Sequence, residues 1–152
     1  VDFSIPQLTY SKDYLKGYQA KTCYGDICKM PLKDNAYDIG ISVGVFMNIH
    51  PSKIGDAIKE MARVCKKYII HLEYDEDNTT KELKYKRSFK TNIVSHNYQK
   101  LYEIMGKEVL QFQTYKDFGE SYALHIKNLQ KKLDCWEEFE GPAKYILTII
   151  KV

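Results

Sequence analysis

Acidic side chains and a glycine stand where predicted strands end, and these residue types suit the binding of a polar ligand. They are found at Asp2, Asp26, Gly44–His50 and Glu73–Asp75. A carboxylate offers two acceptor oxygens, and a glycine lets another group approach the backbone closely. Because ligands of open α/β sheets gather beyond the carboxyl ends of the strands, these positions predict one binding site.

Two further side chains are of types that move protons. His96 and Tyr98 stand at the entry to a predicted helix, where they present a titratable ring and a hydroxyl group. A positioned histidine is the most common general base. The structural alternative is a capping region with surface aromatic residues. His71 lies on the same face of its strand as Glu73 but deeper, which favours a hydrogen-bonded core histidine.

The cysteines show no metal-binding pattern. Cys23, Cys28, Cys65 and Cys135 include no Cys-x-x-Cys pair and have no matching histidine spacing. Scattered cysteines of this kind favour reduced thiols in the cytosol over a disulfide or a zinc site. We therefore expect no metal site and a cytoplasmic protein.

Size and composition predict one globular domain. The chain has 152 residues, 44% of them hydrophobic, and a net charge of +3, which fits a single domain over residues 1–152. Its mean hydropathy of −0.46, with no apolar run near the ~18 residues of a spanning helix, argues against a membrane protein. A charge of +3 is not by itself a nucleic-acid signature. The polar stretch at about 75–95 is expected to leave the core as an excursion.

Local patterns predict the elements that position the candidate residues. Ser4 and Gln7 form a capping box, with Pro6 in the first turn of the helix. Residues 37–47 are almost continuously apolar without alternation, as in a strand buried on both faces. The next segment has helical apolar spacing and ends at Lys66-Lys67, a charge pair suited to a helix C-terminus. The expected strands are 20–24, 37–47, 68–74, 109–115 and 145–150, and the expected helices are 4–16, 51–67, 98–105 and 122–133.

This alternation of strands and helices predicts an α/β fold with a doubly wound, mostly parallel sheet. Four segments then carry a resemblance to Rossmann-like (class I) S-adenosylmethionine-dependent methyltransferases. Residues 25–38 (GDICKMPLKDNAYD) resemble the family's "GD…lPf.d.sFD" stretch. Residues 1–4 are similar to its second strand, residues 42–49 to its fourth strand, and residues 61–70 to its "RVLKPGG" passage.

The resemblance implies roles for individual residues. Asp2 accepts hydrogen bonds from both ribose hydroxyls of S-adenosylmethionine, with Phe3 beside it. Asp26 accepts from the adenine amino group, and Ile27 lies next to the ring. The backbone of Gly44 and Val45 approaches the methionine moiety. The resemblance also implies an antiparallel strand at the C-terminal end of the sheet.

The sequence departs from the family pattern at two places. The glycine-rich turn after the family's first strand is not found among these residues, so we expect the first βαβ portion to be missing from them. A βαβ unit takes about 30 residues or more. The Pro-Gly-Gly turn after Arg63-Val64 is also missing, which affects only the geometry of that loop.

The expected activity is methyl transfer by direct displacement to a small-molecule or carbohydrate-like acceptor. Glu73, His96 and Tyr98 are the expected catalytic residues, at the mouth where the acceptor would lie. An RNA or transfer-RNA methyltransferase is the first alternative, since residues 81–90 interleave basic and aromatic side chains. Acidic residues 75–77 offset that charge, so nucleic acid is less favoured. A non-catalytic binding domain of the same fold is the second alternative.

Overall fold

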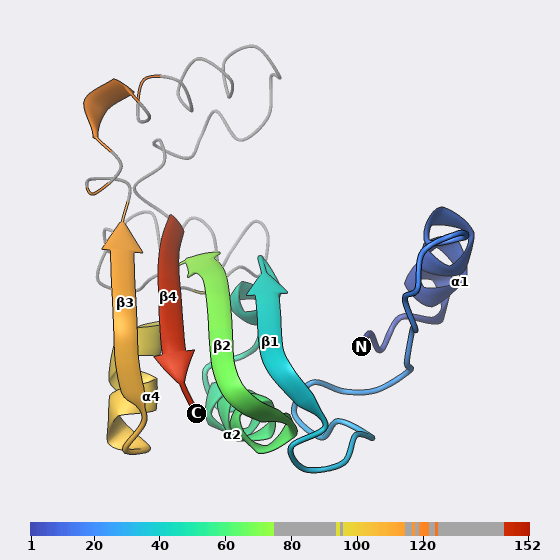
Figure 1. The fold of residues 1–152 in the computed structure, drawn as a ribbon, viewed down its shortest axis with the longest axis horizontal. Coiled ribbons are helices and arrows are strands. Elements are labelled where there is room, and N and C mark those ends of the chain that lie inside the picture. Colours follow the sequence, from blue (N-terminus) through green and yellow to red (C-terminus); the bar gives the residue numbers. More distant parts are fainter. Residues whose placement is uncertain (75–93, 95, 115–116, 118, 122–123, 125–144) are drawn as a thin grey trace.

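A computed structural model shows an α/β fold built on a mixed sheet (Figure 1). It describes residues 1–74, 94, 96–114, 117, 119–121, 124 and 145–152. The strands are β1 (Tyr37–Val43), β2 (Cys65–Tyr74), β3 (Glu108–Thr114) and β4 (Tyr145–Lys151), in the order β1-β2-β4-β3. β1 and β2 are parallel, and β4 is antiparallel to both of its neighbours. This confirms the predicted fold class, including the antiparallel C-terminal strand.

The N-terminal segment begins as predicted. Helix α1 (Ile5–Tyr14) is capped by Ser4, whose hydroxyl accepts from the Gln7 amide at 3.4 Å. The predicted strand at 20–24 is reduced to an isolated parallel bridge between Asp2 and Tyr24. This bridge is one residue pair held by two backbone hydrogen bonds, so the expectation of a full strand was wrong. Figure 1 shows this segment on the β1 side of the sheet, apart from the strands.

The passage from helix α2 to strand β2 is shorter than predicted. The helix spans Ile54–Val64, and the strand begins at Cys65 without a linking loop. Lys66 and Lys67 therefore lie in β2 and not at the helix end, a correction of the predicted boundary. At Gly40 of β1 an added Cβ would lie 2.5 Å from the Cys65 sulfur and 2.9 Å from the Met61 methyl group. The absence of a side chain there lets α2 pack closely on β1.

The described helices α2 and α4 (Tyr98–Ile104) lie on the same face of the sheet (Figure 1). The core forms under them, from residues that include Ile58, Ile69, Tyr102 and Ile150. On the opposite face the apolar side chains of β1 are half or more exposed, among them Ile41 at 67% and Val43 at 60%. The prediction that this strand is buried on both faces was therefore wrong for the described part of the chain.

The third helix and the last two strands agree with the predicted periodicity. α4 is capped by Asn97, whose side chain accepts from the Lys100 amide. Strands β3 and β4 match the predictions at 109–115 and 145–150 to within a residue or so. The excursion at about 75–95 and the predicted helix at 122–133 fall almost wholly outside the described residues. No helix in the described part of the chain is long and apolar enough to cross a membrane.

Candidate active site

Two backbone hydrogen bonds bring the first pair of predicted cofactor residues together. The amide of Asp2 donates to the carbonyl of Cys23, and the amide of Gly25 donates to the carbonyl of Asp2, each at 3.0 Å. Asp2 and Asp26 thus end adjacent segments, as the sequence predicts. One Asp2 carboxylate oxygen accepts from the Ser4 amide at 2.8 Å, and one Asp26 oxygen accepts from the Cys28 amide at 2.8 Å.

The exposure of this region suits ligand binding. Asp2 and Ile27 are partly exposed, and Asp26 is exposed. Phe3 is 75% exposed, so its ring is accessible to a ligand. Ile27 also packs against the hydrophobic core. The two carboxylates therefore face solvent from a segment that the core holds in place.

A tight turn follows strand β1 and contains the second pair of predicted cofactor residues. Gly44 has a φ of +62°, a left-handed conformation that favours glycine. Its amide donates to the Leu72 carbonyl at 3.0 Å, and its carbonyl accepts from the Asn48 side chain at 2.9 Å. A short 3-10 helix, η1 (Phe46–Asn48), completes the turn. Val45 is 44% exposed, so the Gly44–Asn48 turn is partly accessible beyond the sheet.

Glu73 holds this turn from beneath. Its side chain is fully buried, and its carboxylate accepts from the amides of Val45 at 3.0 Å and Met47 at 3.3 Å. The Ser42 hydroxyl donates to the same carboxylate at 2.8 Å. Burial raises the pKa of Glu73 above its ordinary value, and the hydrogen bonds from Ser42 and the turn oppose that rise. The carboxylate thus replaces water as the partner of the turn's amides.

A buried chain of hydrogen bonds continues from Glu73. His71 Nδ1 lies 2.6 Å from the Ser42 hydroxyl, and His71 Nε2 lies 2.7 Å from the Tyr102 hydroxyl. Each hydroxyl has one proton, and that of Ser42 goes to Glu73, so Ser42 accepts from His71 Nδ1–H. His71 Nε2 then accepts from Tyr102. Burial lowers the pKa of His71 to about 3, which keeps the ring neutral.

The other two predicted catalytic residues, His96 and Tyr98, pack next to this buried chain of hydrogen bonds. The His96 ring donates from Nε2 to the Ile49 carbonyl at 2.9 Å. Tyr98 stacks on His71, with ring centroids 5.5 Å apart, and lies edge-on to His96 at 5.9 Å. His96 is 5% exposed, and Glu73 and Tyr98 are 0% exposed. The structure therefore brings the three together under the turn, in a buried position; their direct role in catalysis stays a prediction.

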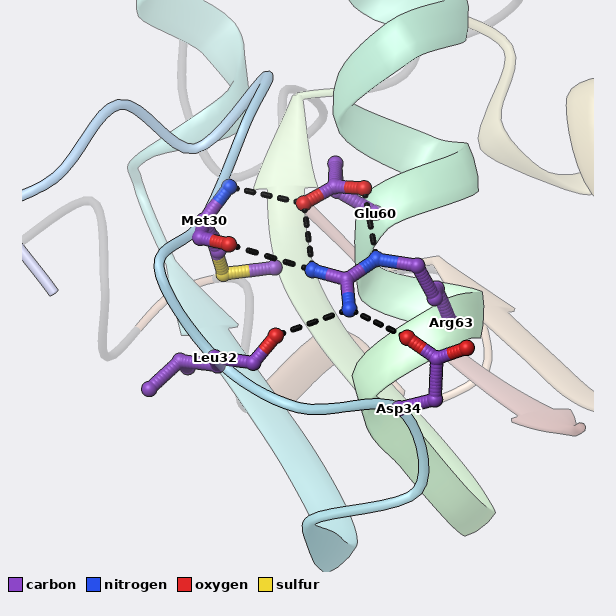
Figure 2. A network of polar contacts seen from close by, with 5 residues as sticks. All are labelled: Met30, Leu32, Asp34, Glu60 and Arg63. Carbon is purple, nitrogen blue, oxygen red and sulfur yellow. Dashed lines mark hydrogen bonds and ion pairs between the residues drawn. The ribbon is translucent and has the colours of Figure 1, made fainter.

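A second polar network fixes the loop that follows Asp26 (Figure 2). The Arg63 guanidinium donates to the carbonyls of Met30 at 3.1 Å and Leu32 at 2.8 Å and to the Asp34 carboxylate. It also forms a two-point contact with Glu60, at 2.7 and 2.8 Å. The Arg63 hydrogen bond lowers the pKa of Glu60, and Glu60 in turn raises that of Arg63.

Sequence reasoning missed four of these residues. Ser42 and Tyr102 contribute the hydroxyls next to His71, and Glu60 and Arg63 hold the loop. The spacing of Glu60 and Arg63, three residues apart on a helix, is a recognisable signal for an ion pair. Nothing in the sequence indicates that Arg63 also reaches a loop about 30 residues earlier.

Comparisons with known proteins agree with the described fold. Residues 1–69 match the family model described as a methyltransferase domain. A putative methyltransferase from Bacillus halodurans is similar in fold, with a TM-score of 0.67 and 14% identity over 99% of this chain and 80% of that one. A putative sarcosine dimethylglycine methyltransferase from Galdieria sulphuraria has a TM-score of 0.68 and 16% identity, over 99% and 68% of the two chains.

A third structure includes a product of the methyl donor. It is the geranyl diphosphate C-methyltransferase from Streptomyces coelicolor in complex with S-adenosyl-L-homocysteine, with a TM-score of 0.67 and 9% identity over 98% of this chain and 60% of that one. No curated protein sequence matches the chain significantly. Residues 1–69 match a methyltransferase domain, and the described residues have the fold of Rossmann-like methyltransferases. The methyl donor of this class of enzyme is S-adenosylmethionine.

Proposed function

We propose that the chain transfers a methyl group from S-adenosylmethionine to a small-molecule or carbohydrate-like acceptor. The observation that carries this proposal is the pairing of Asp2 with Tyr24, which sets two solvent-facing carboxylates, Asp2 and Asp26, at neighbouring segment ends. Carboxylates in that position suit the hydroxyl and amino groups of a nucleoside. The weak net charge of +3 favours a small acceptor over a polyanionic one.

The described residues fit the nucleoside half of the cofactor. Asp2 uses one carboxylate oxygen for the Ser4 amide, which fixes the side chain and leaves the second oxygen for a ribose hydroxyl. Asp26 and Ile27 offer an acceptor and an apolar surface for the adenine. The backbone of Gly44 and Val45 would lie toward the methionine moiety.

The bound cofactor supplies an electrophilic methyl group on a sulfonium. The contribution of this chain is alignment, which accounts for much of the rate in two-substrate reactions. Glu73 fixes the Gly44–Asn48 turn, and His96 ties the Ile49 carbonyl to the start of α4. We propose that Glu73, His96 and Tyr98 serve the reaction by holding this turn against the acceptor. A general base acting directly on the acceptor requires the turn to move, because all three side chains are buried.

The cofactor assignment predicts that Asp2→Ala weakens the binding of S-adenosylmethionine by about tenfold to a hundredfold. A hydrogen bond to a charged group is worth ~1.5–3 kcal/mol. Calorimetric titration of the protein with the cofactor measures the change. Asp13→Ala, a substitution of an exposed acid on α1, is the matched control and should leave the affinity unchanged. Equal affinity in Asp2→Ala and the parent protein would remove Asp2 from the site.

The acceptor class is tested by transfer of labelled methyl groups to a panel of small hydroxy acids, amines, nucleotide sugars and transfer RNA. We expect transfer to one of the small classes, and a His96→Ala variant should lower turnover with cofactor affinity nearly unchanged. Methylation of transfer RNA alone would replace the small acceptor with the RNA alternative. Cofactor binding without transfer to any class would favour a non-catalytic binding domain.

A further inference from the structure

We infer that Arg63 and Glu60 are positioning residues for the cofactor: they set the loop that presents Asp26 and Ile27 to the adenine. This inference rests on the proposed function, because it concerns the same site. The two residues belong to α2 and lie about 30 positions away from the loop in sequence. Neither is one of the residues that the resemblance assigns to cofactor binding.

All N–H donors of the Arg63 guanidinium form hydrogen bonds. It has five N–H donors in a rigid planar fork, and the structure pairs them with five acceptors. Two go to the Glu60 carboxylate, two to the carbonyls of Met30 and Leu32, and one to the Asp34 carboxylate (Figure 2). The backbone carbonyl of Arg63 also accepts from the Asn35 amide at 2.8 Å. One residue thus holds the loop at four successive places.

Glu60 holds the loop together with Arg63, and we call this pair of residues the clamp. Its carboxylate accepts from the Met30 amide at 2.7 Å while it binds Arg63, so both polar groups of the Met30 backbone are held by the pair. The side chains of Glu60 and Arg63 are 17% and 30% exposed. That partial burial strengthens the contact relative to a fully exposed ion pair.

The clamp positions the loop of residues 27–36 and the turn at Asp26 that precedes it. Residues 27–36 contain no helix or ladder of strands, so regular hydrogen bonding does not fix them. Apolar packing supports them in part, since Met30 belongs to the core and Ile27 packs against it, but this packing does not fix the polar backbone groups of the loop. Asp26 bends back onto the Cys28 amide, and its carboxylate therefore moves with the loop. Release of the clamp would loosen the loop at Met30, Leu32 and Asp34, and with it the turn that contains Asp26.

The test compares variants that differ in how many loop contacts they retain. Arg63→Lys keeps the charge but has three donors on one nitrogen, which cannot reach both carbonyls and Glu60. Asp34→Asn alters only the partner that is 71% exposed. Lys67→Met removes the exposed ion pair with Asp38, which does not touch the loop, and serves as the control. Glu60→Gln is the second clamp variant if Arg63→Lys does not fold.

Two readouts separate positioning from mere support of the fold. Hydrogen exchange of the amides in residues 27–36 reports the loop without any ligand, and calorimetry reports the affinity for S-adenosylmethionine and for adenosine. We expect Arg63→Lys to raise exchange in this segment and to weaken both ligands by about tenfold, with Asp34→Asn and Lys67→Met near the parent values. Similar losses for both ligands would place the effect at the adenine end.

Two results would overturn the inference. Unchanged exchange in residues 27–36 would show that Arg63 does not hold the loop. Raised exchange with parent-like affinities would show that the loop is held for stability and not for the cofactor. Failure of the parent protein to bind either ligand would count against the proposed function, and hence against the positioning role, while the exchange data would still decide whether the clamp exists.

Discussion

Glu73→Leu is expected to lower the free energy of unfolding by about 3–5 kcal/mol, because it leaves three hydrogen-bond donors without their buried acceptor, each worth roughly 1–3 kcal/mol. The donors are the Ser42 hydroxyl and the amides of Val45 and Met47. Leucine is of similar size, so loss of packing contributes little. Urea denaturation followed by circular dichroism measures the change.

Glu73→Gln keeps the shape of the side chain and one acceptor oxygen. We expect a smaller loss of stability, of roughly 1–3 kcal/mol, together with a clear loss of turnover, since the turn no longer has a fixed position. Glu108→Gln, at an exposed acid of β3 whose Lys151 partner lies at 3.4 Å, is the matched control. If Glu73→Gln retains both parent stability and parent turnover, Glu73 does not hold the turn.

Acidification is expected to destabilise the protein through His71. Burial lowers the pKa of His71 from 6.5 to about 3 in the folded state. The unfolded chain therefore binds a proton that the folded chain refuses, and stability falls as the pH drops below 6.5. Each pKa unit corresponds to about 1.4 kcal/mol, so the loss reaches roughly 2 kcal/mol at pH 5 and approaches ~4–5 kcal/mol near pH 3.

The experiment compares urea unfolding of the parent protein and His71→Gln at pH 7.5 and pH 5. Burial of Glu73 raises its pKa, which acts in the opposite direction as the pH falls, so the difference between the two proteins is the informative quantity. We expect the parent to lose about 2 kcal/mol more than the variant. Equal losses in parent and His71→Gln would show that His71 is protonated in the folded protein.

The sequence by itself determined the elements that depend on near neighbours. The helix cap at Ser4, the apolar stripe of α2 and a strand at 145–150 were all predicted, because side-chain periodicity and caps act over one or two turns. The second half of the predicted capping box does not form, since the Ser4 amide donates to Asp2. The sequence also placed Asp2, Asp26, Gly44 and Glu73 at segment ends. The order of the four matching motifs was enough to identify the fold class, since each motif has a fixed place in that fold.

Only the tertiary structure decided what each of these residues contacts. From the sequence, a glutamate at a strand end is predicted to face a ligand. Glu73 is buried instead, because the Gly44–Asn48 turn folds over it and donates hydrogen bonds to its carboxylate. The apolar strand β1 reads as buried on both faces, yet the described residues cover only one of them. Arg63 reads as a helix surface residue, although it holds the loop before β1. These contacts join residues about 30 positions apart, and hydrogen bonds over such separations leave no periodic signal in the sequence.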